Sequence, residues 1–158
     1  MRDVLLISSG GGHFDELSRI LNNEIKSRVI GWVINDRSVR NEAFDLSLIH
    51  IVHAERDLRV LWNVIEFVLI FLKYRPRFII STGAGPAVPA ALVAKLFNCK
   101  VIYIETISSV TRLSLTGEIM LWISDHFFVQ WFSLSQFLMN SKKIGVGKVR
   151  FEGSILDT

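Results

Sequence analysis

Three glycines and a histidine stand together near the start of the chain, where residues 8–17 read SSGGGHFDEL. An imidazole has an ordinary pKa near 6.5, so it can accept a proton from a substrate hydroxyl at neutral pH. A glycine turn that opens a helix exposes backbone N–H groups, and these suit a phosphate or pyrophosphate. We therefore predict that Gly10, Gly11 and Gly12 bind phosphate and that His13 is a catalytic base. The local pattern leaves one alternative open, a tight turn with a histidine that caps the helix.

A second glycine turn occurs in residues 81–95, STGAGPAVPAALVAK. Proline is tolerated early in a helix, where its missing N–H costs nothing, so the turn leads into a helix. Gly83 and Gly85 are predicted to leave backbone donors open in the same way. Neither turn has the GxGxxG spacing of a dinucleotide site, so NAD binding is weakly supported and we expect no cofactor.

A third polar cluster follows the segment KVIYIE, residues 100–105. Glu105 and Thr106 end that segment, and serines, threonines and Arg112 follow them. We predict that Glu105, Thr106 and Arg112 contribute to acceptor or phosphate binding, with Glu105 pairing a cation or receiving a sugar hydroxyl. A salt bridge from Glu105 to a neighbouring loop is the alternative.

These clusters need a scaffold that brings them together, and the hydrophobic pattern supplies one. Strand-like and helix-like segments alternate along the chain, which is typical of a parallel sheet with helices on both faces. The expected strands are residues 4–7, 28–34, 48–52, 77–81 and 100–105, and the expected helices are residues 14–21, 58–74 and 87–97. We predict an α/β, Rossmann-like fold in a single domain over residues 1–158, with the three clusters at the carboxyl edge of the sheet. Residues 35–45 are expected to form a surface loop, and the aromatic stretch 125–138 to pack in the core.

The predicted helix 58–74 is unusually apolar, since eleven of the thirteen residues from 60 to 72 are hydrophobic. A membrane-spanning helix needs about 20 such residues, so spanning is not expected. The polar positions 59, 63, 66 and 73 fall on one narrow stripe. The rest of the helix must be covered by the sheet and by another helix, a partner subunit or the headgroup boundary of a membrane.

Composition points to the same kind of surface. Half of the 158 residues are hydrophobic and 21% are charged, with a mean hydropathy of +0.38, so we expect apolar surface that meets a partner or a membrane. The net charge of +3 suits an anionic ligand and is too low for a dedicated nucleic-acid binder. Cys99 is the one cysteine, which excludes an internal disulfide and favours a reducing compartment on the cytosolic side. The N-terminal apolar run is too short for a signal peptide, so Met1 is expected to begin the domain directly.

The three clusters, in this order and followed by DHFFVQW, resemble a known family. It is the acceptor-side subunit family of the two-part N-acetylglucosaminyltransferase that adds the second sugar to dolichol pyrophosphate, and the chain is most similar to its bacterial branch in exopolysaccharide and capsule biosynthesis. The resemblance implies the N-terminal Rossmann-like half of a GT-B glycosyltransferase. The other half would be a partner subunit that binds the nucleotide sugar.

The resemblance also implies a reaction. The chain would present a polyprenyl-pyrophosphate-linked saccharide, and His13 would be the base for an inverting transfer that needs no metal. The family usually has an arginine where Ser109 stands and often a lysine where Glu118 stands, so Arg112 is expected to substitute in binding phosphate. The eukaryotic subunit has a transmembrane anchor that this chain lacks.

We therefore expect peripheral attachment to the cytoplasmic face of the membrane through the helix 58–74 and its basic end. The residues assigned to this contact are Trp62, Phe67, Phe71, Lys73 and Arg75. Two other functions remain open: a noncatalytic anchor or activator of a partner glycosyltransferase, and a free-standing nucleotide-binding domain.

Overall fold

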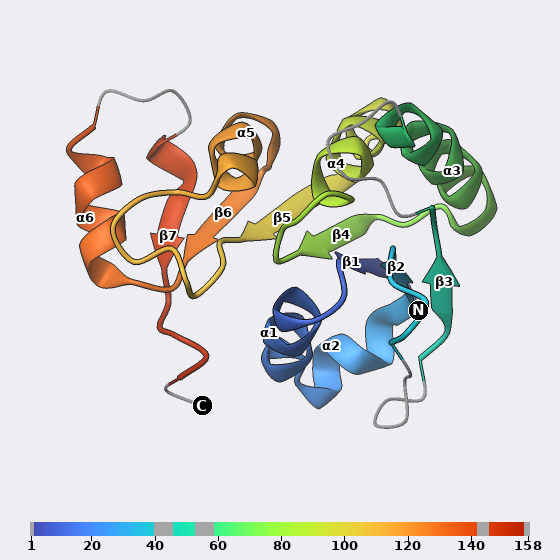
Figure 1. Cartoon of the computed structure of the whole chain (residues 1–158), viewed down its shortest axis with the longest axis horizontal. Coiled ribbons are helices and arrows are strands. Elements are labelled where there is room, and N and C mark those ends of the chain that lie inside the picture. The colour runs from blue at the N-terminus through green and yellow to red at the C-terminus, as the bar shows by residue number, and fades with distance from the viewer. Residues whose placement is uncertain (1, 40–45, 53–58, 142–145, 157–158) are drawn as a thin grey trace.

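The computed structural model describes residues 2–39, 46–52, 59–141 and 146–156. It contains seven strands and six α-helices in these segments (Figure 1). The strands are β1 Val4–Ser8, β2 Val29–Ile34, β3 Leu48–His50, β4 Phe78–Ser81, β5 Lys100–Ile104, β6 His126–Val129 and β7 Val149–Phe151. The helices are α1 Gly12–Ile20, α2 Asn23–Arg28, α3 Arg59–Tyr74, α4 Ala87–Leu96, α5 Leu115–Ile123 and α6 Phe132–Met139, and a 3-10 turn, η1 Val146–Lys148, precedes β7.

All strands are parallel and form one sheet in the order β3-β2-β1-β4-β5-β6-β7. The chain builds outward from β1 to β3 and then returns to place β4 on the other side of β1. The order of the strands therefore reverses between β1 and β4, and ligands of open α/β sheets bind beyond the carboxyl ends of the strands at such a point. The predicted α/β, Rossmann-like class is confirmed.

The two faces of the sheet are covered by different helices. Figure 1 shows α3, α4 and α5 on one side and α1 and α2 on the other. Along β1, the side chains of Leu5 and Ile7 enter the core under α3 and α4, whereas Val4 and Leu6 enter the core under α1. This alternation has the period of two that a strand imposes on its side chains, and it makes every residue of β1 buried.

The sequence analysis missed several elements near the C-terminus. It assigned residues 125–138 to core packing without elements, and the structure places β6 and α6 there. It also predicted no helix at α5 and no strand at β7. Both segments are short, and α5 has apolar residues on its exposed side as well as its buried side, so neither has a clear one-sided pattern. Of the predicted surface loop 35–45, residues 40–45 lie outside the described residues.

Candidate functional site

The candidate site begins at the point where β1 and β4 end side by side. The Nδ1 atom of His13 lies 3.0 Å from the carbonyl oxygen of Thr82, and the hydroxyl of Thr82 donates to the carbonyl of His13 at 2.8 Å. Two reciprocal hydrogen bonds thus join the first turn of α1 to the residue after β4. The sequence analysis placed the two glycine turns at one edge, and the structure brings them into contact there.

This contact fixes which nitrogen of His13 carries the proton. A carbonyl oxygen only accepts hydrogen bonds, so Nδ1 must be the donor. In the neutral ring, Nε2 is then left with a free lone pair. In the part of the chain that the structure describes, no side chain or backbone group binds Nε2. The imidazole is therefore oriented as a proton acceptor at the edge of the sheet.

The glycines of the two turns differ in what surrounds them. A Cβ at Gly11 or Gly12 would meet nothing within 4 Å, and both residues are exposed, so there is room in front of these backbone groups. Gly11 also has a positive φ of 69°, which favours glycine. At Gly10, by contrast, a Cβ would overlap the carboxylate of Asp36, so this glycine serves the packing of the turn.

Gly83 is the tight position of the second turn. Its φ is 116°, and a Cβ there would lie 3.0 Å from the hydroxyl of Tyr103 and 3.4 Å from the ring of His13. A side chain at Gly83 would therefore push the imidazole out of place. Gly85 is exposed on the same turn, at the start of α4.

The carboxylate of Glu105 is withdrawn into the structure. Its side chain is fully buried and accepts hydrogen bonds from the backbone of Thr106, the hydroxyls of Ser109 and Ser114, and the backbone of Ser114. A Cβ at Gly117 would overlap this carboxylate, so the glycine allows α5 to approach it. Burial raises the pKa of Glu105, and these donors lower it in part.

This geometry changes the role that the sequence suggested for Glu105. It neither faces the open edge nor forms the salt bridge of the alternative; it holds the loop between β5 and α5. Ser109, which stands where the family's arginine was expected, is itself buried against this carboxylate. Arg112 is exposed in the same loop.

A polar network that the sequence analysis did not single out links the loop to α1. Glu16 accepts hydrogen bonds from the hydroxyl of Thr106 at 2.8 Å and from the backbone of Ile107 at 3.3 Å. The amide of Gln130, which follows β6, donates to the carbonyl of Glu105 at 3.0 Å. These are the first polar residues after β5 and β6 and an acidic residue one turn after His13. Their positions at strand ends were a usable signal.

The residues assigned to membrane association divide into two groups. Trp62 is 62% exposed, and Lys73 and Arg75 are also exposed. Phe67 and Phe71, however, are fully buried under α3. Their assignment to membrane contact was wrong, because these two rings lie on the arc of α3 that packs on the sheet and on α4.

The polar residues of α3 face the protein rather than the solvent. Asn63 is 2% exposed, and its amide donates to the carbonyl of Val52 and to the carboxylate of Glu66. Glu66 in turn accepts from the backbone of Val52. The polar stripe predicted from the sequence is thus used to bind the segment after β3.

The solvent-facing side of α3 is apolar as a consequence. We call this surface the apolar arc, and it consists of Leu61, Trp62, Ile65, Leu69 and Leu72, each at least half exposed. It has exposed apolar neighbours on the other two helices of this face: Leu92 and Leu96 on α4, and Leu115, Ile119 and Trp122 on α5. No helix within the described residues is both long and apolar enough to cross a bilayer.

The structure has two sizeable cavities, neither centred on His13. One of about 410 Å³ lies beside Gln130, where Ile104 and Phe128 of the sheet are only partly covered. The other, of about 590 Å³, lies at the opposite edge of the sheet. Across residues 2–39, 46–52, 59–141 and 146–156, no cluster of His, Cys, Asp and Glu side chains has the makings of a metal site.

The chain is similar to one protein family over more than half of its length. The model of the family described as "Oligosaccharide biosynthesis protein Alg14 like" matches residues 56–147. The UDP-N-acetylglucosamine transferase subunit ALG14 of Candida albicans is 45% identical over 43% of this chain and 34% of its own length. The human subunit of the same name is 24% identical over 90% of this chain and 81% of its own length.

Solved structures share the fold at low sequence identity. MurG of Acinetobacter baumannii aligns with a TM-score of 0.67 at 13% identity, over 82% of this chain and 41% of that protein. The UDP-GlcNAc 2-epimerase of Methanocaldococcus jannaschii aligns with a TM-score of 0.71 at 17% identity, over 99% of this chain and 47% of that protein. This chain therefore spans less than half of each of these two-lobed proteins' length.

Proposed function

We propose that this chain, which belongs to the Alg14 family, is the acceptor-binding and membrane-recruiting subunit of a heteromeric glycosyltransferase. The pyrophosphate of a polyprenyl-linked saccharide would lie over the exposed backbone of Gly11 and Gly12, where α1 begins. The positive end of the α1 dipole favours an anion at that place. Thr106 and Arg112, from the loop after β5, would contribute further donors.

The chemistry falls to His13 and to groups that the partner brings. Nε2 of His13 takes the proton of the acceptor hydroxyl, whose oxygen then forms a bond to the anomeric carbon of the donor sugar. The bond between that carbon and the nucleoside diphosphate breaks, and the diphosphate leaves with the electron pair. A single displacement of this kind inverts the configuration at the anomeric carbon. Thr82 keeps Nδ1–H in place while the ring gains its second proton.

The observation that carries the proposal is the hydrogen bond between His13 Nδ1 and the carbonyl of Thr82 at 3.0 Å. It can be tested with two substitutions. His13→Asn keeps an N–H near the position of Nδ1 but has no proton acceptor in place of Nε2, and His13→Ala removes both. Loss of a general base typically costs about 10²–10⁴-fold in rate.

Both variants, assayed with the partner subunit present, should lose transfer by that factor. The Asn variant should keep the thermal stability of the wild type more closely than the Ala variant. Transfer at the wild-type rate by either one would remove His13 from the mechanism.

A partner subunit is supported by the size of the chain. It aligns with 41% of MurG and 47% of the epimerase, so the region that would match the rest of those proteins must come from elsewhere. The printed names of the relatives suggest UDP-N-acetylglucosamine as the sugar donor, and we propose that the partner binds it. The exopolysaccharide or capsule pathway expected from the sequence stays a prediction, since the names of these eukaryotic relatives do not mention it.

The apolar arc supports the membrane-recruiting role. A helix that turns its asparagine and glutamate inward and its leucines outward gains nothing from water on that side. We propose that α3 lies against the membrane surface that holds the lipid-linked acceptor, on its cytoplasmic side. The uncovered part of the sheet at Ile104 and Phe128 is then available to the partner subunit.

A noncatalytic anchor remains the second candidate, favoured by the withdrawal of Glu105 and the absence of the family's arginine at Ser109. The two functions differ in whether this chain can be replaced. An unrelated membrane tether fused to the partner should restore transfer if this chain is only an anchor. It should fail if this chain binds the acceptor.

A further inference from the structure

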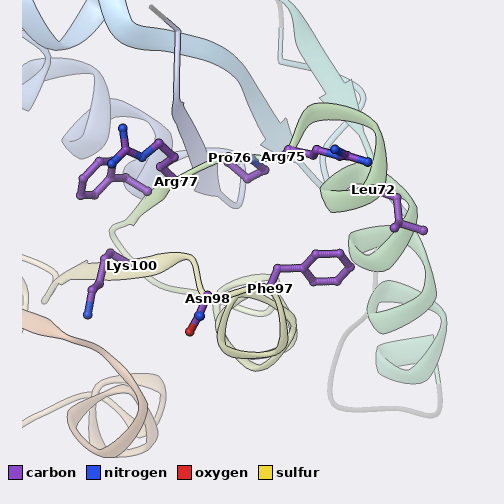
Figure 2. Close-up of a pocket in the computed structure, with 8 residues that line it drawn as sticks. Leu72, Arg75, Pro76, Arg77, Phe97, Asn98 and Lys100 are labelled. Carbon is purple, nitrogen blue, oxygen red and sulfur yellow. The ribbon is translucent and has the colours of Figure 1, made fainter.

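The larger cavity, of about 590 Å³, lies at the edge of the sheet opposite His13. It is formed where α3 and α4 end and where β4 and β5 begin (Figure 2). We call it the basic cavity, because three of its lining residues are cations: Arg75, Arg77 and Lys100. Leu72 and Phe97 line it as well, and Figure 2 shows the ring of Phe97 directed toward the end of α3.

The backbone positions of these residues follow from the way the helices end. Arg75 has a φ of 47° and closes α3 with a hydrogen bond to the carbonyl of Phe71. Asn98 has a φ of 56° at the corresponding place after α4. Left-handed residues commonly end helices in this way. Each helix therefore stops abruptly before the next strand, and the two ends leave a hollow between them.

The cavity has an excess of positive charge. Asp3 and Asp125 are acidic residues at this edge, but Asp3 is held by Arg28 and Asp125 by Lys95, in addition to its longer contact with Lys100. A helix C-terminus carries roughly half a negative charge. Two such ends do not balance three cations, so the basic cavity favours an anion.

The basic cavity is also continuous with the apolar arc. Leu72 belongs to both, and Phe97 is 36% exposed beside it. The arc extends along α3, whose 16 residues span about 24 Å. One end of this helix is near the carboxyl edge of the sheet and the other end is at the basic cavity. A flat apolar surface laid on α3 would therefore reach the cavity.

We infer that the basic cavity binds the phosphate-bearing headgroup of an anionic phospholipid, with Arg75, Arg77 and Lys100 around the phosphate and Leu72 and Phe97 against the start of the acyl chains. This inference rests on the proposed contact between α3 and the membrane. A headgroup at this end of α3 fixes how the helix lies on the bilayer. It thereby fixes the distance of His13 from the membrane surface.

The test uses the full chain and vesicles of two compositions, pure phosphatidylcholine and phosphatidylcholine with phosphatidylglycerol. The variant is Arg75→Gln with Arg77→Gln. The matched control is Arg19→Gln with Lys26→Gln, which removes the same charge from α1 and α2 on the other face of the sheet. A cation next to an anionic surface contributes about fivefold to binding, so the cavity variant should lose about 25-fold on anionic vesicles.

The cavity variant should bind neutral vesicles as the wild type does, and the control should keep most of its anionic binding. An equal loss in the control would assign the effect to net charge and overturn the headgroup site. If the wild type binds vesicles but shows no preference for the anionic ones, the headgroup site is wrong while the membrane contact stands. If it binds neither kind, both proposals fail.

A second measurement separates a lipid headgroup from free phosphate. Dihexanoyl-phosphatidylglycerol, kept below its micelle concentration, should shift the NMR signals of Lys100 and Asn98, and inorganic phosphate at the same concentration should not. Equal shifts with inorganic phosphate, combined with unchanged vesicle binding of the variant, would make this a phosphate site and overturn the inference.

Discussion

The loop after β5 and the outer side of α3 use polar and apolar residues in opposite ways. At the loop, a fully buried carboxylate, Glu105, is surrounded by backbone and hydroxyl donors. On α3, leucines and a tryptophan face outward while Asn63 is buried. The loop spends polar groups on internal order, and the helix keeps apolar groups for an external contact.

This difference indicates which part of the surface is complete in the isolated chain. The loop after β5 has its hydrogen bonds satisfied internally, so its shape does not depend on a partner. The apolar arc has no cover from any described residue, so it is the part that a membrane or another protein must complete. Position in the sheet links the two regions, because α3 leads from the carboxyl edge of the sheet, where the loop lies, to the opposite edge.

The largest effect is expected from making the apolar arc polar. Replacing Leu61, Ile65 and Leu69 together by serine removes three large apolar side chains that are at least half exposed. Burial of one such side chain is worth about 1.5–3 kcal/mol when complete, so binding to neutral vesicles should fall by about a hundredfold or more. Vesicle cosedimentation measures this loss.

The control for this triple variant is Met139→Ser with Leu156→Ser. These residues are as exposed as those of the arc, but they lie on α6 and in the C-terminal segment (Figure 1). The control should bind vesicles as the wild type does. Equal binding by the triple variant would show that α3 does not meet the membrane.

Removal of the buried carboxylate should affect stability instead of binding. Glu105→Ala leaves four hydrogen bonds without their acceptor, and unsatisfied buried groups cost about 1–3 kcal/mol each before the loop relaxes. We expect a loss of about 3 kcal/mol in the free energy of unfolding, measured with urea. Glu118→Ala, at an exposed position of α5, should change it by less than about 0.5 kcal/mol. Similar values for both would mean that Glu105 does not order the loop.

The polar residues of α3 should behave like the loop and unlike the arc. Asn63→Ala removes the donor to the carbonyl of Val52 and leaves a space in a buried position. The expected loss is about 2 kcal/mol of unfolding free energy, with unchanged binding to vesicles per folded molecule. A variant with normal stability and weak vesicle binding would place Asn63 on the membrane side.

The smallest effect is the pH dependence that Glu105 contributes. Its pKa is raised from 4.5 by burial, so its contribution to stability is fully present below pH 4.5 and is lost as the pH rises through the raised value. The stability of the wild type relative to Glu105→Gln should therefore fall between pH 4.5 and pH 8. Asp3 and Asp125 have lowered pKa values, so they act below pH 4 and do not interfere. A difference that stays constant over this range would contradict the raised pKa.

Local patterns were enough to predict the scaffold and the meeting of the two glycine turns. The alternation of buried strands and amphipathic helices determines the sheet, and the carboxyl ends of parallel strands share an edge, so His13 and Thr82 had to be near each other. The partners of Glu105 could not be predicted, because they depend on how residues 106–114 fold back. The burial of Phe67 and Phe71 could not be predicted either, since nearly every position of α3 is apolar and the pattern does not say which arc is outside.

The most direct test of the account asks whether this chain holds the acceptor and is incomplete as a catalyst. The purified chain would be placed in nanodiscs with a polyprenyl-pyrophosphate-linked N-acetylglucosamine, and acceptor binding and transfer from UDP-N-acetylglucosamine would be measured with and without the partner subunit. The account predicts that the chain alone binds the acceptor and transfers no sugar, and that adding the partner starts the transfer. Full transfer by the chain alone, or no binding of the acceptor, would contradict it.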